Sequence, residues 1–386
     1  MSIFKITEDI VYIGCNDRKI DLFEGQYVVP EGISYNSYII KDEKIAVMDT
    51  ADKNFGKEWL ENLEEALEGK TPDYLVISHM EPDHASNIVK LAEKYPNVKI
   101  VGNAKTFVFY NQFFDLDISD RKIVVKDGDV LDLGEHKLHF VFAPMVHWPE
   151  VMVTYDEKDK VLFSADGFGK FGALDADEDW ACEARRYYFN IVGKYGAQVQ
   201  ALLKKAAALD IEIICPLHGP VLKDNLDYYI DKYNVWSSYK PEDKGVTIAY
   251  GSIYGNTANA AKKLAEILKA KGEENVSLFD LARDDMAEAI EDAFRYDCIV
   301  VGSSTYDGGL FPCVEDFLHH LKIKNYQGRT AGIIENGTWA PVSGKQIKAY
   351  FESMKNITVL ENTVTIKSVL KDESALEKLA DEIINR

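Results

Sequence analysis

HMEPDH, at residues 79–84, places two histidines and two carboxylates within six residues, directly after the apolar run DYLVIS. The apolar run predicts a buried strand, so the polar side chains lie where that strand ends. Pro82 cannot continue a helix and favours an extended Glu81, so His79, Glu81 and Asp83 are expected to share one face. Imidazoles and carboxylates crowded in this way are costly unless a cation neutralises them. The stretch therefore predicts a metal site.

Three further candidate ligands each follow a predicted strand. His147 follows KLHFVFAPMV, Asp166 follows KVLFSA and His218 follows IEIICPL. A single histidine after a strand is usually only hydrogen-bonded, and Asp166 alone could be a turn residue before Gly167. With HMEPDH, however, they form a set too large for one tetrahedral zinc ion, which indicates two ions bridged by Asp166. The candidate catalytic and metal-binding residues are His79, Glu81, Asp83, His84, His147, Asp166 and His218.

This donor set contains no thiolate, and its carboxylates nearly equal its imidazoles in number. An oxygen-rich set with open positions is typical of non-haem iron used in oxygen chemistry, although ligand type alone does not decide the metal. The remaining histidines lack comparable neighbours and are expected at the surface or the edge of the core; they are His136, His139, His319 and His320.

Composition limits the class of protein. At 386 residues, with 46% hydrophobic residues, the chain is long enough for two domains with sizeable cores. The net charge of −20 argues against nucleic acid or an anionic membrane as the main partner. No apolar run is as long as the 18 or so residues of a membrane span, and the first residues lack the apolar core of a signal peptide. Five cysteines without a CxxC pair favour a reducing cytoplasm and argue against a thiolate-bound iron centre.

The chain is expected to divide at SSYKPEDKG (237–245), a small and charged stretch with one Pro and one Gly. The predicted domains are residues 1–243 and 246–386. After the linker, five short apolar runs alternate with amphipathic helical segments, which predicts a doubly wound parallel sheet of flavodoxin size. Before the linker, strand runs are mixed with helical stretches, which predicts an α/β or α+β sandwich.

The segment YGSIYGNTANAA (250–261) follows a predicted strand and opens a predicted helix. It lacks both a GK[ST] ending and a full GxGxxG pattern, which disfavours ATP and dinucleotides. Its polar side chains and the N–H groups at the helix start predict a nest for a phosphate monoester. Tyr306 and Trp339, on two further loops after strands, could bracket a planar ring, although each could also pack in the core. Together the three loops predict FMN, with candidate contacts Ser252, Ile253, Tyr254, Gly255, Asn256, Thr257, Ser304, Thr305, Tyr306, Asp307, Gly308, Asn336, Gly337, Thr338 and Trp339.

Both halves of the sequence resemble the flavodiiron proteins, also called A-type flavoproteins. The shared motifs are HMEPDH, HWPE (147–150), SADGFGKFGA (164–173), PLHGP (216–220) and SIYGNT. The resemblance implies a metallo-β-lactamase-like αββα sandwich followed by a flavodoxin-like five-stranded parallel sheet. It also places Glu81 where the related hydrolases have a third histidine, and a carboxylate at that position suits iron better than zinc.

The resemblance further implies how two iron ions would be held. One iron would be bound by His79, Glu81, His147 and Asp166. The other would be bound by Asp83, Asp166 and His218, with His84 as a possible further ligand. The side chains expected close to this centre are Trp148, Phe168, Phe171 and Tyr195.

The implied function is that of an oxidoreductase that reduces O2 to water, NO to N2O, or both. FMN would relay electrons from an external donor such as rubredoxin or a reduced deazaflavin coenzyme. A head-to-tail homodimer, or a dimer of such dimers, would bring each FMN near the irons of its partner in the cytoplasm. Two alternatives stay open at this point: a binuclear zinc hydrolase with an appended flavodoxin domain, and an electron carrier with an inactive first domain.

Overall fold

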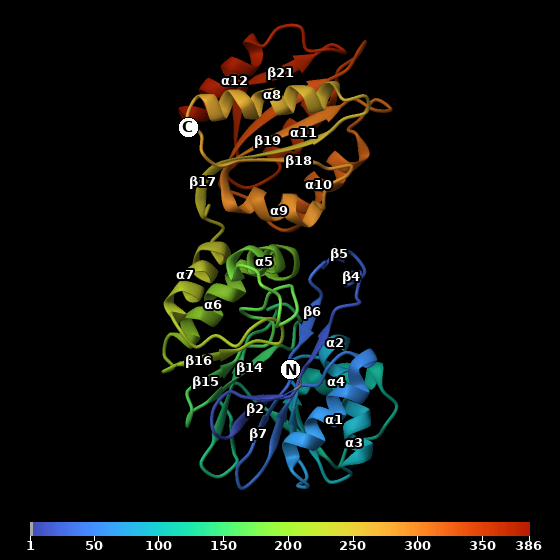
Figure 1. Ribbon diagram of the computed structural model, residues 1–386, viewed down its shortest axis with the longest axis vertical. Coiled ribbons are helices and arrows are strands. Elements are labelled where there is room, and N and C mark those ends of the chain that lie inside the picture. Colours follow the sequence, from blue (N-terminus) through green and yellow to red (C-terminus); the bar gives the residue numbers. More distant parts are fainter. Residues whose placement is uncertain (1–2) are drawn as a thin grey trace. The chain divides into compact units, whose positions relative to one another are not determined.

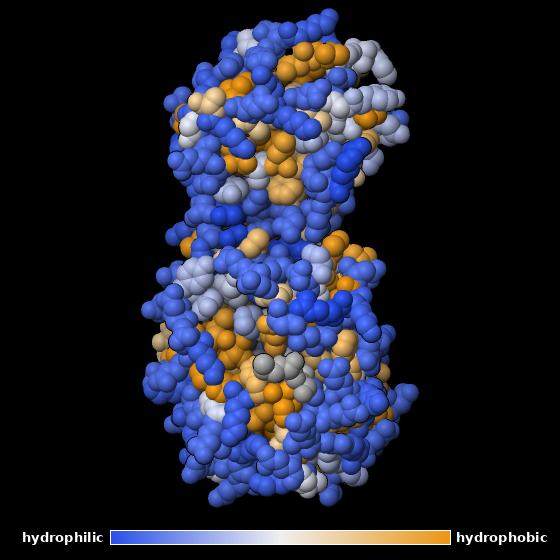
Figure 2. Space-filling model, in the orientation of Figure 1, coloured by the Kyte–Doolittle hydropathy of each residue, from blue (hydrophilic) through white to orange (hydrophobic). Residues whose placement is uncertain are grey.

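The computed structural model describes residues 3–386, which form two compact units. Each unit is made of two segments of the chain. The first unit contains the residues up to Tyr188 and the segment Ala197–Asn234, and the second contains Phe189–Gly196 and Val235–Arg386. Sequence patterns did not predict that the short segment Phe189–Gly196 would group with the second unit. Hydrophilic residues cover most of the face shown in Figure 2, in keeping with a chain in which 28% of residues are charged. None of the helices within residues 3–386 has the length and apolar character that crossing a bilayer requires.

The first unit is built on two packed sheets. In spatial order, the larger sheet contains β1 (Phe4–Lys5), β2 (Ile10–Tyr12), β7 (Tyr38–Ile40), β8 (Ala46–Met48), β9 (Tyr74–Val76), β10 (Lys99–Asn103) and β11 (Lys122–Val125). The smaller sheet contains β12 (Val130–Asp132), β13 (Lys137–Phe142), β14 (Met152–Asp156), β15 (Val161–Phe163) and β16 (Ile213–Cys215). Two short pairs complete the unit: β3 (Cys15–Asp17) with β6 (Ile33–Tyr35), and β4 (Leu22–Phe23) with β5 (Tyr27–Val28).

The apolar faces of the two sheets form one core. Met48 and Val76 of the larger sheet belong to the same buried cluster as Phe140 and Phe163 of the smaller sheet. Helices cover the outer faces (Figure 1): α1 (Gly56–Leu67), α3 (Ile88–Lys94) and α4 (Ala104–Phe113) on one side, and α5 (Trp180–Tyr187), α6 (Gly196–Ala206) and α7 (Leu226–Ser237) on the other. The predicted αββα sandwich is therefore confirmed.

Strand direction explains how distant residues reach one place. β15 and β16 are parallel neighbours, so the segments that follow them, with Asp166 and His218, leave the sheet at the same edge. β9 is parallel to both β8 and β10 and is followed by His79 and Glu81. The side chains of this edge therefore come from the ends of strands in both sheets.

The second unit is a doubly wound parallel sheet, as predicted. Its strands lie in the order β18 (Val276–Asp280), β17 (Asp243–Gly251), β19 (Tyr296–Ser304), β20 (Thr330–Asn336) and β21 (Thr358–Ile366). Figure 1 shows α8 (Asn256–Ala270) and α12 (Ser374–Ile384) on one face, and α9 (Met286–Arg295), α10 (Pro312–Ile323) and α11 (Ser343–Glu352) on the other. The chain order reverses between β17 and β19, which is where sheets of this kind bind ligands.

The predicted linker is partly structured. α7 ends at Ser237 and β17 already begins at Asp243, so only residues 238–242 of the stretch 237–245 lie outside a helix or strand. The difference arises because Asp243 pairs with Tyr296 of β19, a long-range partner that the local sequence does not reveal.

Candidate metal centre and cofactor cavity

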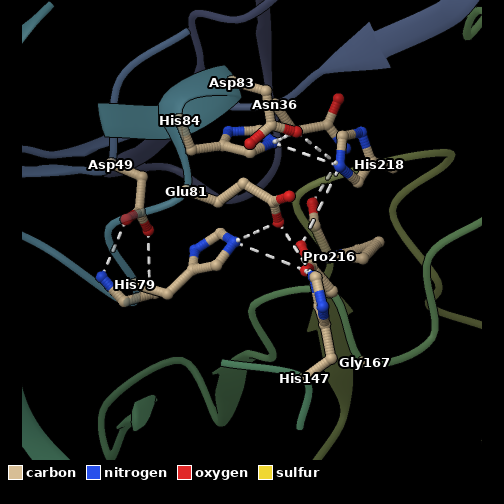
Figure 3. A network of polar contacts seen from close by, with 12 residues as sticks. Asn36, Asp49, His79, Glu81, Asp83, His84, His147, Gly167, Pro216 and His218 are labelled. Atoms are coloured by element: carbon tan, nitrogen blue, oxygen red, sulfur yellow. Dashed lines mark hydrogen bonds and ion pairs between the residues drawn. The ribbon is translucent and has the colours of Figure 1, made fainter. Parts of the chain in front are cut away.

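The first group of candidate ligands contains His79, Glu81, His147 and Asp166, whose donor atoms lie within 4.8 Å of one another. Nε2 of His147 lies 2.8 Å from Oε2 of Glu81 and 3.0 Å from Oδ2 of Asp166. Nε2 of His79 lies 3.4 Å from the same oxygen of Glu81 and 3.4 Å from that of Asp166. Figure 3 shows the side chains of His79, Glu81 and His147 pointing toward one another. The four side chains thus surround a single point.

The second group contains Asp83, His84 and His218. Oδ2 of Asp83 lies 3.2 Å from Nε2 of His218 and 3.6 Å from Nε2 of His84. The same Nε2 atoms of the two histidines are 3.4 Å apart. Asp83 and His84 reach this position because Pro82 begins the one-turn helix α2 (Pro82–Ala85), while Glu81 before it is extended as predicted, with φ −61° and ψ 134°.

Asp166 faces both groups. Its Oδ2 lies against His147 and His79 of the first group, while its Oδ1 is 3.9 Å from Nε2 of His218 in the second. The structure therefore brings all seven predicted residues together and places Asp166 between the two sets.

The donor atoms of this centre point at shared space without satisfying each other. Among the described residues, both ring nitrogens of His79 and both carboxylate oxygens of Asp83 and of Asp166 are buried without a hydrogen bond. Buried polar atoms without partners are rare in folded proteins, because each costs the free energy of removing it from water. Two cations bound at this place would give Nε2 of His79 and the carboxylates of Asp83 and Asp166 the partners they lack, so the residues present fit a binuclear metal centre.

The electrostatics agree with this interpretation. Burial disfavours a charged His147, but Asp166 and Glu81 outweigh burial and raise the pKa of His147 to about 10. Burial disfavours a charged Glu81 as well, yet the neighbouring imidazoles of His147 and His79 lower the pKa of Glu81 to about 2. Protons thus balance the carboxylates of the first group, and a bound cation would displace them.

Backbone carbonyls orient the two histidines of the second group. Nδ1 of His84 lies 3.2 Å from the carbonyl oxygen of Thr50, and Nδ1 of His218 lies 2.7 Å from that of Ser34. Each Nδ1 therefore carries the proton and each Nε2 offers its lone pair to the centre. Burial also lowers the pKa of His84 to about 4, which keeps its ring neutral, as a metal ligand requires.

Two buried acids hold the backbone of the HMEPDH stretch, and sequence reasoning missed both. Oδ1 and Oδ2 of Asp49 accept hydrogen bonds from the backbone N–H and hydroxyl of Ser78 at 2.7 and 2.6 Å. Oε1 of Glu150 accepts one from the N–H of Met80 at 2.8 Å. Asp49 directly follows a strand-like run, KIAVM, so the signal that identified Asp166 could also have identified Asp49.

Aromatic rings enclose the centre. The rings of Phe23 and Tyr187 each lie 5.5 Å from that of His218, and the ring of Tyr35 lies 6.1 Å from it. The predicted neighbour Trp148 packs edge-on against His79, with ring centroids 6.4 Å apart.

Of the other three predicted neighbours, two pack on aromatic residues of the first unit. Phe171 packs on Tyr187, Phe168 stacks on Tyr233, and Tyr195 belongs to the second unit. The tyrosines whose rings lie beside that of His218 are Tyr187 on α5 and Tyr35 on β6.

A third group, His136, Asp156 and Asp159, also has donor atoms within 4.8 Å of one another, but cationic side chains of the protein lie against the carboxylates in and around it. His136 is fully buried, contrary to the expectation of a surface or edge position, because carboxylates surround its ring. Its Nδ1 lies 3.0 Å from Oδ2 of Asp156 and its Nε2 lies 3.4 Å from Oδ2 of Asp9. Lys158 also binds Asp9, with a distance of 2.7 Å between Nζ and Oδ2. The protein's own cations thus neutralise this cluster.

The second unit contains a cavity of about 420 Å³ at the carboxyl ends of β17, β19 and β20. Its lining consists of Ser252, Ile253, Tyr254, Asn256, Thr257, Ser304, Thr305, Asp307, Gly308, Asn336, Gly337, Thr338, Trp339, Ala340, Val342 and Ser368. Two predicted contacts are not among these residues. Gly255 is the residue before α8, where its φ of 86° shapes the turn, and the ring of Tyr306 packs edge-on against Phe311. The missed residues are Ala340, Val342 and Ser368, of which Ser368 follows β21.

The cavity fits FMN. The first N–H groups of α8 have no partners within the helix and face the start of the cavity. Thr257 and Ser304 contribute hydroxyls 2.9 Å apart, and the buried hydroxyl of Ser252 has no hydrogen-bond partner among the described residues. None of the lining residues is Lys or Arg, so dipoles and hydrogen bonds would hold the phosphate, as predicted. Trp339, which is 92% exposed, offers a free aromatic face beside the same cavity.

Two protein families match the chain. Residues 33–219 match the ODP family beta lactamase, and residues 247–363 match a flavodoxin domain. An uncharacterised protein of Methanocaldococcus jannaschii is 30% identical over 379 residues, which cover 97% of this chain and 95% of that protein. The anaerobic nitric oxide reductase flavorubredoxin of Aliivibrio fischeri is 32% identical over 349 residues, which cover 86% of this chain and 69% of that protein.

Two solved structures are also similar over nearly their whole length. The rubredoxin oxygen:oxidoreductase of Desulfovibrio gigas has a TM-score of 0.90 at 28% identity, covering 99% of this chain and 97% of that one. The flavodiiron protein of Giardia intestinalis has a TM-score of 0.92 at 26% identity, covering 100% of this chain and 97% of that one.

Proposed function

The chain belongs to the flavodiiron proteins, a family of oxidoreductases, and from that premise we propose that it reduces O2 to water, NO to N2O, or both. Its flavodoxin domain implies FMN, and two iron ions form the metal centre of the family. We assign the metal centre to residues 1–243 and the FMN site to residues 246–386.

The observation that supports the proposal most directly is the position of Asp166. One of its carboxylate oxygens faces the group with Glu81, and the other faces the group with His218. In our assignment two irons would share Asp166, and His79, Glu81 and His147 would hold the first while Asp83 and His218 would hold the second. We add His84 to the second iron, because its Nε2 faces the same point as that of His218.

The cofactors, when bound, supply electrons and Lewis acidity for cleaving the O–O bond or for joining two NO molecules. The chain's own residues bind and shield them. Three carboxylates in the centre, those of Glu81, Asp83 and Asp166, would offset part of the positive charge of two bound irons. The rings of Phe23, Tyr35 and Tyr187 cover the side of His218 and would exclude water there.

We propose that an external donor reduces the FMN. Rubredoxin and a reduced deazaflavin coenzyme are the two candidates, and the name of the Desulfovibrio gigas relative supports the first. A head-to-tail homodimer, or a dimer of such dimers, is our proposal for the assembly, because it would bring the FMN of one chain near the irons of another.

A single-turnover experiment tests the proposal without a physiological donor. The holoprotein is reduced anaerobically with dithionite, excess reductant is removed, and O2 or NO is added in small portions. Reduced FMN and two ferrous ions together hold four electrons, which is what the reduction of one O2 to two waters requires.

We expect one O2 to be consumed per chain without release of hydrogen peroxide, or N2O to be formed from NO, while the FMN absorbance returns. Metal analysis run in parallel should find two irons per chain. Two tightly bound zinc ions with hydrolysis of thioesters or phosphodiesters and no gas consumption would support the zinc hydrolase instead.

A further inference from the structure

A buried asparagine, Asn36, holds the loop that carries His218, and we propose that Asn36 positions the second metal ion. Asn36 lies between β6 and β7, far from His218 in sequence, and is fully buried. The inference rests on the proposed function, since it takes Asp83, His84 and His218 as ligands of one iron. It adds a positioning residue that touches no metal itself.

Asn36 binds three of the four carbonyl groups in the loop Pro216–Gly219. Its side-chain Nδ2 donates to the carbonyl oxygens of Pro216 and Gly219, both at 2.8 Å. Its backbone N–H donates to the carbonyl oxygen of Leu217, also at 2.8 Å. These three carbonyls flank His218 on both sides, so a single residue fixes the turn from which the imidazole projects.

The neighbours of Asn36 act on the same loop. The hydroxyl of Ser34 accepts a hydrogen bond from the N–H of Gly219 at 2.7 Å. The carbonyl oxygen of Ser34 accepts another from Nδ1 of His218, also at 2.7 Å. The hydroxyl of Tyr38 donates to the carbonyl oxygen of Pro216 at 2.5 Å. The segment Ser34–Tyr38 thus holds the backbone and ring of His218 from one side, and Asn36 is the middle residue of that segment.

The hydrogen bonding of Asn36 indicates what this position requires. Both N–H donors of the amide are used, whereas its Oδ1 is buried and has no hydrogen-bond partner among the described residues. An unsatisfied buried acceptor lowers stability, so its presence needs an explanation. The explanation we infer is that both donors are needed to hold the loop of a metal ligand, because the position of a ligand is set by the groups that hold its backbone and ring.

The test uses the full chain with FMN bound, freed of iron by a chelator and titrated with Co²⁺ alone. Cobalt reports each site through its visible absorption. The wild type should bind two ions. In Asn36→Leu, which has similar volume and no donor, the first ion should bind as in the wild type, while affinity for the second should fall about 10–100-fold, the usual range for partners of metal ligands.

Asn62→Leu is the matched control. Asn62 is also a buried asparagine of the first unit, and its Nδ2 donates to the carbonyl oxygen of Gly14 at 3.0 Å, away from both metal groups. It should bind both cobalt ions as the wild type does, even if its urea midpoint falls as far as that of Asn36→Leu. A purely structural role for Asn36 would make the two variants alike.

Tyr38→Phe gives a second and milder measurement, because it removes one donor to Pro216 and no packing volume. Its affinity for the second ion should fall several-fold, and this variant decides the matter if Asn36→Leu does not fold. Wild-type affinity for both ions in the variant that folds overturns the role of Asn36 and leaves the proposed function standing. A wild type that binds fewer than two ions overturns the ligand assignment itself.

Discussion

The metal centre and the FMN cavity differ in how far their residues are buried and hydrogen-bonded before a ligand binds. The centre buries His79, His84, Asp166 and His218 almost completely and leaves several of their donor atoms without hydrogen bonds. The cavity is lined mainly by small polar residues that end or follow β17, β19, β20 and β21, and Trp339 at its rim is almost fully exposed. The centre is therefore incomplete without its cations, whereas the cavity is already formed by the topology of the parallel sheet.

The largest expected effect comes from Asp166, the residue shared by the two metal groups. Asp166→Asn keeps the shape of the side chain but removes the charge that faces both positions. We expect loss of both irons and a fall in O2 or NO reduction well beyond the roughly 10–100-fold typical of outer partners, because a direct ligand is removed. FMN content should stay unchanged. Iron and flavin analysis of the purified variant, with single-turnover gas consumption, measures both.

Asp17→Asn is the control for Asp166→Asn. Asp17 is another buried carboxylate of the first unit, and its Oδ1 accepts backbone hydrogen bonds from Lys19 and Ile20 at 2.8 and 3.0 Å. This variant should keep both irons. If Asp166→Asn also kept them, the bridging role of Asp166 would be wrong.

Glu81 provides a test of metal choice rather than metal binding. Glu81→His restores the third imidazole of the related hydrolases and removes one negative charge from the first group. We expect the variant to bind two metals but with a higher ratio of zinc to iron, and to lose about tenfold or more in gas reduction. Metal analysis after growth with both metals gives the ratio. Glu81→Asp, which keeps the carboxylate, should remain an iron protein; equal zinc content in the two variants would contradict the role of the charge.

In the FMN cavity we expect a single substitution to weaken binding less, because many weak contacts together hold the ligand. Thr257→Val removes the hydroxyl that lies 2.9 Å from that of Ser304 at the start of α8. The dissociation constant of FMN should rise about tenfold, which equals about 1.4 kcal/mol, and iron content should not change. Fluorescence titration of the deflavinated protein measures it. Thr247→Val, in the buried middle of β17, is the control and should bind FMN normally.

Sequence patterns predicted the parts of both sites that depend on local order. The end of each predicted strand identified His147, Asp166 and His218, because ligands at strand ends need only the chain direction. Asn36 escaped detection, since its contacts with Pro216 and Gly219 join β6–β7 to a loop 180 residues away and exist only after both sheets have packed. Tyr306 shows the reverse case, because its place on a cavity loop was predictable but the direction of its ring was not.

In the cluster around His136, side chains of the protein already pair the buried charges, unlike in the metal centre. A substitution there should therefore have the smallest effect of those predicted. Burial opposes a charge on His136, but hydrogen bonds to Asp156 and Asp9 outweigh it and raise the pKa of His136. Because folding raises this pKa, the protonated ring stabilises the fold below its unfolded pKa of about 6.5, and that contribution is lost as pH rises through the folded value. His136→Gln should therefore cost about 1 kcal/mol in acid and less in alkali, seen as a fall in urea midpoint relative to the wild type. The variant should keep both irons and FMN, because the carboxylates of this cluster are paired with side chains of the protein and not with a metal. Loss of iron from this variant would show that His136 contributes to metal binding.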